Sequence, residues 1–178
     1  MPMLSDLIHK ALVFSSKAHR DQLRKSTDIP YISHPAAVGM ILLKAGCRDE
    51  LVAAGILHDC LEDADVTDKD ILQEFGAEVL ELVKGASEPD HHSKTWKERK
   101  QHTIDYLKSA SHDVRMVACA DKFHNVMNIL MDFHALGGIG YGSDLARIRK
   151  VRFGIIRNWR KVLRPMSSVK YCLRNFLI

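Results

Sequence analysis

The sequence LVAAGILHDCLED, residues 51–63, combines an apolar run with four polar residues that include a His-Asp pair. Seven consecutive apolar or small residues, 51–57, precede His58 and Asp59. Such a continuous apolar run predicts a central, buried helix, which we place over residues 49–63. An imidazole and a carboxylate at the end of a buried helix are costly to bury unless each has a partner. This stretch therefore predicts both a helical core and a polar site at the edge of that core.

Helical periodicity extends over nearly the whole chain. Apolar residues recur at three- and four-residue intervals, and no segment alternates strictly as a half-buried strand does. We therefore predict an all-α fold, a single-domain bundle of about seven to nine helices, with residues 1–163 as the domain and 164–178 as a C-terminal tail. The expected helices cover residues 4–20, 35–45, 49–63, 68–76, 77–86, 95–109, 112–133 and 144–163. Expected caps are Ser5 or Asp6, Thr67 and, at the end of the second helix, Gly46.

The composition narrows the class of protein. The 178 residues include 26 Lys or Arg and 22 Asp or Glu, for a net charge of +4, and 46% are hydrophobic. That apolar share can form a packed core and excludes disorder as the main state. No apolar run reaches the roughly 18–20 residues of a membrane span, and the N-terminus lacks a signal-peptide pattern. Four scattered cysteines without a CxxC pair favour reduced thiols. We predict a cytoplasmic protein without a membrane partner.

The basic charge is concentrated at the C-terminal end. Residues 145–178 contain ten Lys or Arg and no acidic residue. Such a segment can bind a polyanion, but it can also be a solvated helix face or contact an acidic part of the same fold. No aromatic-rich motif or Gly-Arg repeat accompanies it, so nucleic-acid binding has little support. The Gly-rich residues 137–142 lack the Lys-Ser/Thr of a phosphate-binding P-loop.

Four potential metal ligands interrupt otherwise apolar stretches: His34, His58, Asp59 and Asp121. A single histidine on an apolar helix face is usually a core residue with its hydrogen bonds satisfied, but four such interruptions favour a metal site. Two imidazoles and two carboxylates make a mixed nitrogen and oxygen donor set. This set suits an ion such as Mn²⁺ or Fe²⁺ better than a thiolate-bound structural zinc.

Two further carboxylates, Glu62 and Asp63, follow the His58-Asp59 pair by four residues. Residues four apart share a helix face, so we expect Glu62 beside His58 and Asp63 beside Asp59. Carboxylates that the metal does not use can orient or deprotonate an attacking water, which makes both residues candidate catalytic groups. The alternative is that they begin an exposed acidic loop.

Several basic or amide side chains near these ligands could bind phosphate oxygens, as Arg and Lys commonly do. Each of these groups is alternatively a solvated surface residue. The candidate substrate-binding residues are Arg24, Lys25, Lys94, Lys97, Lys122 and Asn125.

Five strings in order resemble one known family. They are RK at 24–25, PYISHP at 30–35, AGILHD at 54–59, LED at 61–63 and ADKFHN at 120–125. Together they resemble the hydrolase domain of RelA/SpoT-type proteins, in the HD phosphohydrolase superfamily, over about residues 5–160. The resemblance implies an HD phosphohydrolase domain over residues 1–163. It also assigns the metal to the four ligands above, water activation to Glu62 and Asp63, and nucleotide contacts to Arg24, Lys25 and Asn125.

The resemblance further implies Mn²⁺-dependent hydrolysis of the nucleotides ppGpp and pppGpp, which removes the 3′-pyrophosphate and leaves GDP or GTP. The chain looks like a stand-alone small alarmone hydrolase, a group that includes the metazoan SpoT homologue. Those metazoan relatives carry an Arg and a Tyr four residues apart in the last helix, where this chain has Arg149 and Phe153. Arg149 is thus an expected substrate contact.

The missing hydroxyl at Phe153 leaves open a different nucleotide substrate, such as NADPH. A third reading is a non-catalytic nucleotide- or RNA-binding regulator that uses the basic residues 145–178. Homo-oligomerisation is also left open.

Overall fold

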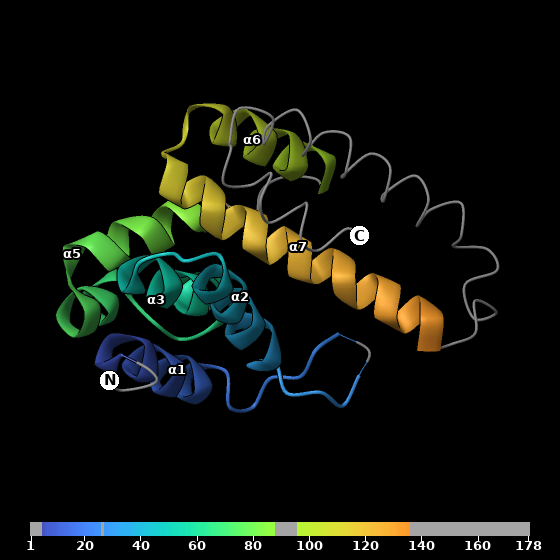
Figure 1. The fold of residues 1–178 in the computed structure, drawn as a ribbon, viewed down its shortest axis with the longest axis horizontal. Coiled ribbons are helices and arrows are strands. Elements are labelled where there is room, and N and C mark those ends of the chain that lie inside the picture. The colour runs from blue at the N-terminus through green and yellow to red at the C-terminus, as the bar shows by residue number, and fades with distance from the viewer. Residues whose placement is uncertain (1–4, 26, 88–95, 136–178) are drawn as a thin grey trace. The chain divides into compact units, whose positions relative to one another are not determined.

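The computed structural model describes residues 5–25, 27–87 and 96–135, which contain seven helices and no strand apart from an isolated bridge between Leu23 and Pro30. The helices are α1 (Asp6–Ala18), α2 (Ser33–Lys44), α3 (Asp49–Leu57), α4 (Cys60–Asp63), α5 (Asp68–Ala86), α6 (Trp96–Ser109) and α7 (His112–Ala135) (Figure 1). The all-α prediction is confirmed, and the helix number agrees with the predicted seven to nine. The expected helix over 144–163 and the boundary at 163–164 lie outside the described residues.

The chain divides into two compact units, residues 1–121 and 122–178. The first unit holds α1 to α6 and the first part of α7. Of the second unit, the structure describes the remainder of α7, from Lys122 to Ala135. None of the helices in the described ranges is long and apolar enough to cross a membrane.

Local signals set the helix ends where the sequence predicts them. The Ser5 hydroxyl accepts a hydrogen bond from the Ile8 N–H at 3.3 Å and caps α1. At the start of α5, Thr67 forms a capping box with Asp70. Gly46 follows the end of α2 with a φ of 75°, and Gly76 has a φ of 83°. Gly76 therefore breaks α5 into two helical segments, as the sequence predicts.

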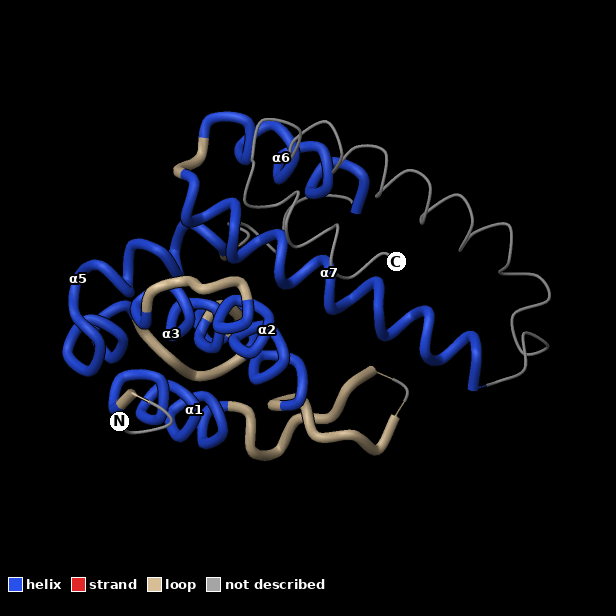
Figure 2. Tube along the Cα trace, in the orientation of Figure 1, coloured by secondary structure: helices blue, strands red, loops and turns tan. Residues whose placement is uncertain are grey.

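Helix α3 is the centre of the first unit. All seven residues from 51 to 57 are buried, and α3 packs against α1, α2 and α5. Figure 2 shows these helices joined by loops without any strand. The buried position of α3 explains its unbroken apolar sequence, since a helix that is covered on several sides has no polar face to expose.

Two glycines allow α2 and α3 to approach closely. A Cβ atom on Gly39 would lie 2.4 Å from Ile56 Cγ1, and one on Gly55 would lie 2.3 Å from Leu42 Cδ1. Since residues 45–48 are a short connection, the two helices form a hairpin in which the start of α2 lies alongside the end of α3. This packing brings His34, in the first turn of α2, close to His58, which follows α3.

The prediction of one helix over residues 49–63 is wrong at its centre. Helix α3 ends at Leu57 and α4 begins at Cys60. The His58 ring donates from Nδ1 to the carbonyl oxygen of Gly55 at 2.8 Å. In a continuous helix that carbonyl would accept the N–H of Asp59, so the side chain competes with the helix ladder. The shared helix face expected for Glu62 and His58 stays a prediction.

Candidate metal centre

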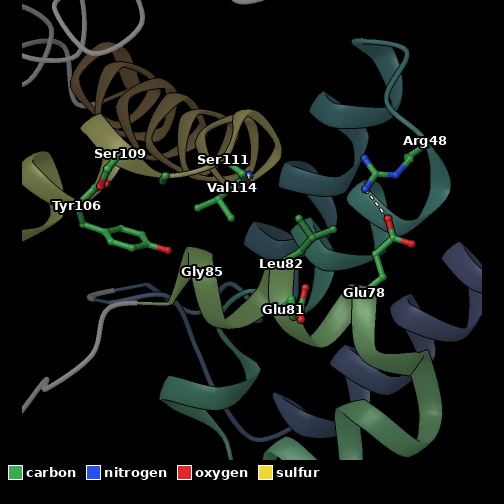
Figure 3. A pocket seen from close by; sticks show the side chains of 10 residues that line it. Arg48, Glu78, Glu81, Leu82, Gly85, Tyr106, Ser109, Ser111 and Val114 are labelled. Carbon is green, nitrogen blue, oxygen red and sulfur yellow. Dashed lines mark hydrogen bonds and ion pairs between the residues drawn. The ribbon is translucent and has the colours of Figure 1, made fainter.

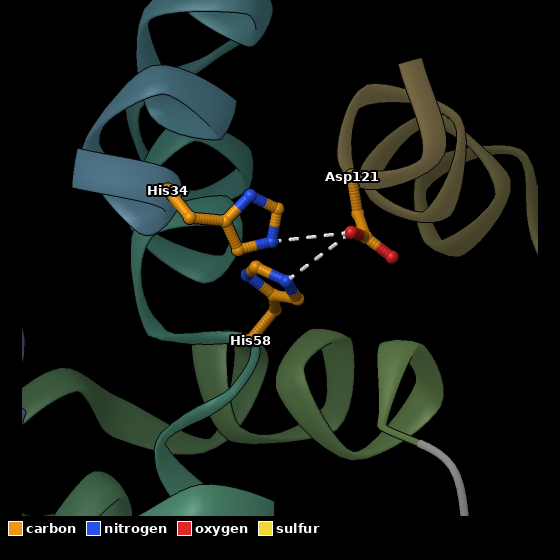
Figure 4. Close-up of side chains that lie close together, drawn as sticks. All are labelled: His34, His58 and Asp121. Carbon is orange, nitrogen blue, oxygen red and sulfur yellow. Dashed lines mark ion pairs between the residues drawn. The ribbon is translucent and has the colours of Figure 1, made fainter. Parts of the chain in front are cut away.

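Three elements contribute side chains to one buried cluster (Figure 4). His34 comes from α2, His58 from the turn after α3, and Asp121 from α7. One ligand atom from each residue lies within 4.8 Å of the other two. Asp121 Oδ1 is 3.2 Å from His34 Nε2 and 3.9 Å from His58 Nε2. All three residues are at most 7% exposed, so their polar atoms are removed from bulk water.

Asp59 completes the set of four predicted ligands. Its Oδ1 lies 3.0 Å from His58 Nε2, and its Oδ2 lies 3.6 Å from His34 Nε2. The same Oδ2 accepts a hydrogen bond from the Tyr31 hydroxyl at 2.7 Å. The structure therefore brings together all four residues that the sequence singles out as ligands, although Asp121 is 62 positions from Asp59 in the chain.

The hydrogen bonds of His58 test whether this cluster fits a cation. The Gly55 carbonyl can only accept, so Nδ1 carries a proton and Nε2 is the ring nitrogen that is left to bind a metal ion. That buried Nε2 has no hydrogen-bond partner within the described part of the chain, although Asp59 Oδ1 is only 3.0 Å away. A divalent cation between Nε2 and the carboxylate oxygens of Asp59 and Asp121 would bind to a nitrogen donor and to oxygen donors at once. The donor set therefore fits a divalent metal ion, and histidine ligands commonly donate their other N–H to a carbonyl in this way.

A cysteine beside the cluster does not add a thiolate ligand. Burial raises the pKa of the Cys60 thiol to about 12, and the charge of Asp59 acts in the same direction, whereas a hydrogen bond with Ser15 lowers it. The group of potential ligand atoms in the described residues is formed by His34, His58 and Asp121, so its donor atoms are nitrogen and oxygen. Such a set suits ions like Mn²⁺ and Fe²⁺.

The predicted catalytic carboxylates follow the cluster on the short helix α4. The backbone N–H of Glu62 donates to the carbonyl oxygen of Asp59 at 3.2 Å, and the Glu62 side chain is half-buried. The side chain of Asp63 lies outside the described part of the structure. The catalytic roles of both residues stay predictions.

Among the predicted phosphate-binding residues, Arg24 is linked to the cluster through Tyr31. Its guanidinium carbon lies 5.8 Å from the centre of the Tyr31 ring, and Tyr31 bonds to Asp59. Lys25 is exposed in the same loop. Lys122 and Asn125 follow Asp121 on α7 but belong to the second unit. The side chain of Lys97 on α6, and all of Lys94 and Arg149, lie outside the described residues.

A separate cavity of about 510 Å³ is lined by residues of α5, α6 and the start of α7 (Figure 3). Arg48 lines the cavity, and its guanidinium donates hydrogen bonds to the carboxylates of Glu78 and Asp113, each at 2.5 Å. Burial raises the pKa of the Asp113 carboxyl, but the hydrogen bonds and charges of Arg48 and His112 outweigh this and hold that pKa below its usual value. None of the residues predicted for the functional site lines this cavity.

Two residues that lie against the cluster, Tyr31 and His19, carry no functional prediction from the sequence. Tyr31 appears there only as part of the string PYISHP. In the structure Tyr31 contacts Asp59 directly, and His19 is 1% exposed and packs against the Tyr31 ring. No periodic pattern marks either residue. Their significance depends on partners that are distant in sequence.

The fold and the cluster define an all-α protein with a buried His/Asp site for a divalent metal. Residues 11–132 match the family model described as an HD domain, and the chain belongs to this family.

Its relatives include enzymes of guanine nucleotide turnover. The chain is 37% identical over 126 residues to a guanosine-3′,5′-bis(diphosphate) 3′-pyrophosphohydrolase of Borreliella burgdorferi, covering 68% of this chain and 19% of that protein. It is 34% identical over 119 residues to the guanosine-3′,5′-bis(diphosphate) 3′-pyrophosphohydrolase MESH1 of Danio rerio, covering 65% of each. The chain thus spans about a fifth of the first relative and just under two thirds of the second.

Solved structures show the same relationship. A metazoan ortholog of SpoT, which hydrolyzes ppGpp and plays a role in starvation responses, has a TM-score of 0.67 and 28% identity over 74% of each chain. A crystal structure of a Listeria monocytogenes EGD-e protein has a TM-score of 0.53 and 41% identity over 61% of this chain and 68% of the other. The predicted resemblance to RelA/SpoT-type hydrolase domains is confirmed.

Proposed function

We propose that this chain is a Mn²⁺-dependent 3′-pyrophosphohydrolase of ppGpp and pppGpp, acting in the cytoplasm. The observation that carries the proposal is the buried cluster of His34, His58 and Asp121 with the half-buried Asp59 beside it, in which His58 Nε2 faces two carboxylates without a hydrogen-bond partner in the described residues. Relatives named for this reaction support the choice of substrate.

In this proposal the four clustered residues hold the ion, which when bound supplies Lewis-acid polarisation of the phosphate and of the attacking water. Glu62 or Asp63 accepts the proton of that water. The water oxygen bonds to the phosphorus attached to ribose O3′, the P–O3′ bond breaks, and O3′ takes up a proton. The products are GDP or GTP and pyrophosphate. Arg24 and Lys25 neutralise negative charge on the phosphates.

The test starts with metal-stripped protein incubated with ppGpp, with and without Mn²⁺, and separates the products by anion-exchange chromatography. We expect GDP and pyrophosphate only when Mn²⁺ is present. Absence of turnover in a protein that binds Mn²⁺ would refute the substrate assignment. Asp59→Ala should lose both Mn²⁺ binding and turnover.

The same assay tests the proton acceptor. Glu62→Ala should keep Mn²⁺ binding and lose about 10²–10⁴-fold in kcat, the usual contribution of a general base. Glu81→Ala, which removes a carboxylate that lines the separate cavity, is the matched control and should keep full activity. Full turnover in Glu62→Ala would remove Glu62 from the mechanism.

A different nucleotide is the second candidate, because the resemblance matches Phe153 to a tyrosine of the metazoan relatives and phenylalanine lacks the hydroxyl. Comparing kcat/KM for NADPH and for ppGpp on one preparation decides between these substrates. The non-catalytic regulator predicts instead that nucleotide or RNA binding survives Asp59→Ala and weakens steeply with salt.

A further inference from the structure

The hydroxyl of Tyr31 is a hydrogen-bond donor to the Asp59 carboxylate. It donates to Oδ2 at 2.7 Å, while Oδ1 lies 3.0 Å from His58 Nε2. The two oxygens of one carboxylate thus face different neighbours. The terminal torsion of an aspartate is broad, so a donor on one oxygen restricts where the other oxygen points.

Tyr31 is itself held in place by groups outside the cluster. Its backbone N–H donates to the carbonyl oxygen of Gln22 at 2.8 Å. Its ring lies 5.0 Å from the ring of His19, which is 1% exposed and pairs through Nδ1 with Gln22 Oε1 at 2.8 Å. The loop before α2 is therefore fixed through both its backbone and the aromatic ring.

His19 also contacts the turn that carries Asp59. Its Nε2 lies 3.6 Å from the sulfur of Cys60, the residue that follows Asp59. The buried His19 ring thus touches Tyr31 on one side and the Asp59-Cys60 turn on another. The donor hydroxyl and the acceptor carboxylate are positioned by the same buried histidine, so their separation is set by packed groups and does not depend on a mobile loop.

We propose that Tyr31 is a positioning residue that orients the Asp59 carboxylate for metal binding. The proposal rests on the metal centre of the proposed function and adds a residue to it. With Oδ2 held by Tyr31 at 3.6 Å from His34 Nε2, Oδ1 is directed toward His58 Nε2. Loss of a hydrogen-bond partner behind a metal ligand typically weakens metal binding by about 10–100-fold.

The experiment compares Mn²⁺ binding by wild type and Tyr31→Phe. The variant removes only the hydroxyl and keeps the ring that packs against His19. Tyr106→Phe is the matched control, because Tyr106 lines the separate cavity and shares no contact with the cluster in the described residues. Free Mn²⁺ is measured by electron paramagnetic resonance in titrations of metal-stripped protein, and thermal unfolding without metal verifies that each variant is folded.

We expect Tyr31→Phe to raise the Kd for Mn²⁺ about 10–100-fold and Tyr106→Phe to leave it unchanged. At saturating Mn²⁺, the Tyr31→Phe protein should recover most of its kcat. An unchanged Kd together with a raised KM for nucleotide would overturn the proposal, since Tyr31 would then contact substrate and not position the metal ligand.

The binding titration uses no nucleotide, so it separates this proposal from the choice of substrate. A protein that shows the predicted Kd difference but does not hydrolyse ppGpp would refute the proposed reaction and support the role of Tyr31. A wild-type protein that binds no Mn²⁺ at all would refute both.

Discussion

Replacing Gly55 by alanine should weaken the fold and the metal site together. The new Cβ would lie 2.3 Å from Leu42 Cδ1 and 3.4 Å from Val38 Cγ1. Ordinary contacts between carbon atoms are about 3.5–4.0 Å, so Leu42 must retreat by more than about 1 Å or the helices must separate. Leu42 is only 1% exposed and has little room to move. We therefore expect α2 and α3 to shift apart.

The expected loss of stability is the difference between two opposing effects. Overpacking a filled core costs about 1–3 kcal/mol, whereas alanine in place of glycine within a helix contributes about 1 kcal/mol in its favour. The free energy of unfolding should therefore fall by about 1 kcal/mol, which lowers the unfolding midpoint by about 2–4 °C. Since the Gly55 carbonyl accepts the His58 Nδ1–H, the same shift displaces His58 from His34. We expect the Kd for Mn²⁺ to rise about tenfold.

Circular dichroism melts of metal-free protein and Mn²⁺ titrations measure the two effects. Gly46→Ala is the control, because Gly46 has a φ of 75° and a Cβ atom at this position would meet no atom within 4 Å among the described residues. It should cost about 1–2 kcal/mol through backbone conformation alone and leave Mn²⁺ affinity unchanged. Wild-type stability and affinity in Gly55→Ala would refute the packing argument. Equal loss of Mn²⁺ affinity in Gly46→Ala would refute the link to His58.

Three further outcomes test the electrostatics and the metal. The pKa of Asp113 is lower in the folded protein than its unfolded value of about 3.9. The ionised Asp113 therefore stabilises the fold at a pH above about 3.9, and this stabilisation is lost as the pH falls through the folded pKa. Urea unfolding at pH 6 should therefore show Asp113→Asn to be less stable than wild type by about 0.2–1 kcal/mol, a small value because Arg48 is half exposed. The difference in the free energy of unfolding should disappear in acid. Cys60, with a pKa near 12, should resist iodoacetamide at pH 8 in folded protein and react in urea, as followed by mass spectrometry. Mn²⁺ at a hundred times its Kd should stabilise the protein by about 2.7 kcal/mol, an effect that a chelator reverses and Asp121→Ala abolishes.

Most helix boundaries could be predicted because the signals that set them are local. A hydroxyl at Ser5 or Thr67 satisfies N–H groups within the next turn, and a glycine at position 46 adopts a left-handed conformation without help from distant residues. The break after Leu57 has a different origin. The spacing of apolar residues is the same for one helix over residues 49–63 as for two shorter helices. The hydrogen bond from His58 to Gly55 cannot be recognised from that spacing.

The four candidate ligands could be predicted from the sequence, but the neighbouring residues Tyr31 and His19 could not. Each of the four residues is a potential metal ligand that interrupts an apolar stretch, so burial and chemistry are both visible in the sequence. Tyr31 lies in a loop, where no periodicity applies, and its partner Asp59 is 28 residues away. His19, at the end of α1, looks like an ordinary last-turn residue until the fold places it against Cys60.

The interrupted helix and the metal centre are one structural feature. His58 and Asp59 form the turn between α3 and α4, and both keep right-handed helical backbone angles. His58 Nε2 lies 3.0 Å from Asp59 Oδ1 there. The bond from His58 Nδ1 to Gly55 that competes with the helix also orients the ring, which leaves Nε2 directed at the cluster. The residue that follows the central helix is thereby a candidate ligand, and its neighbour is a second candidate.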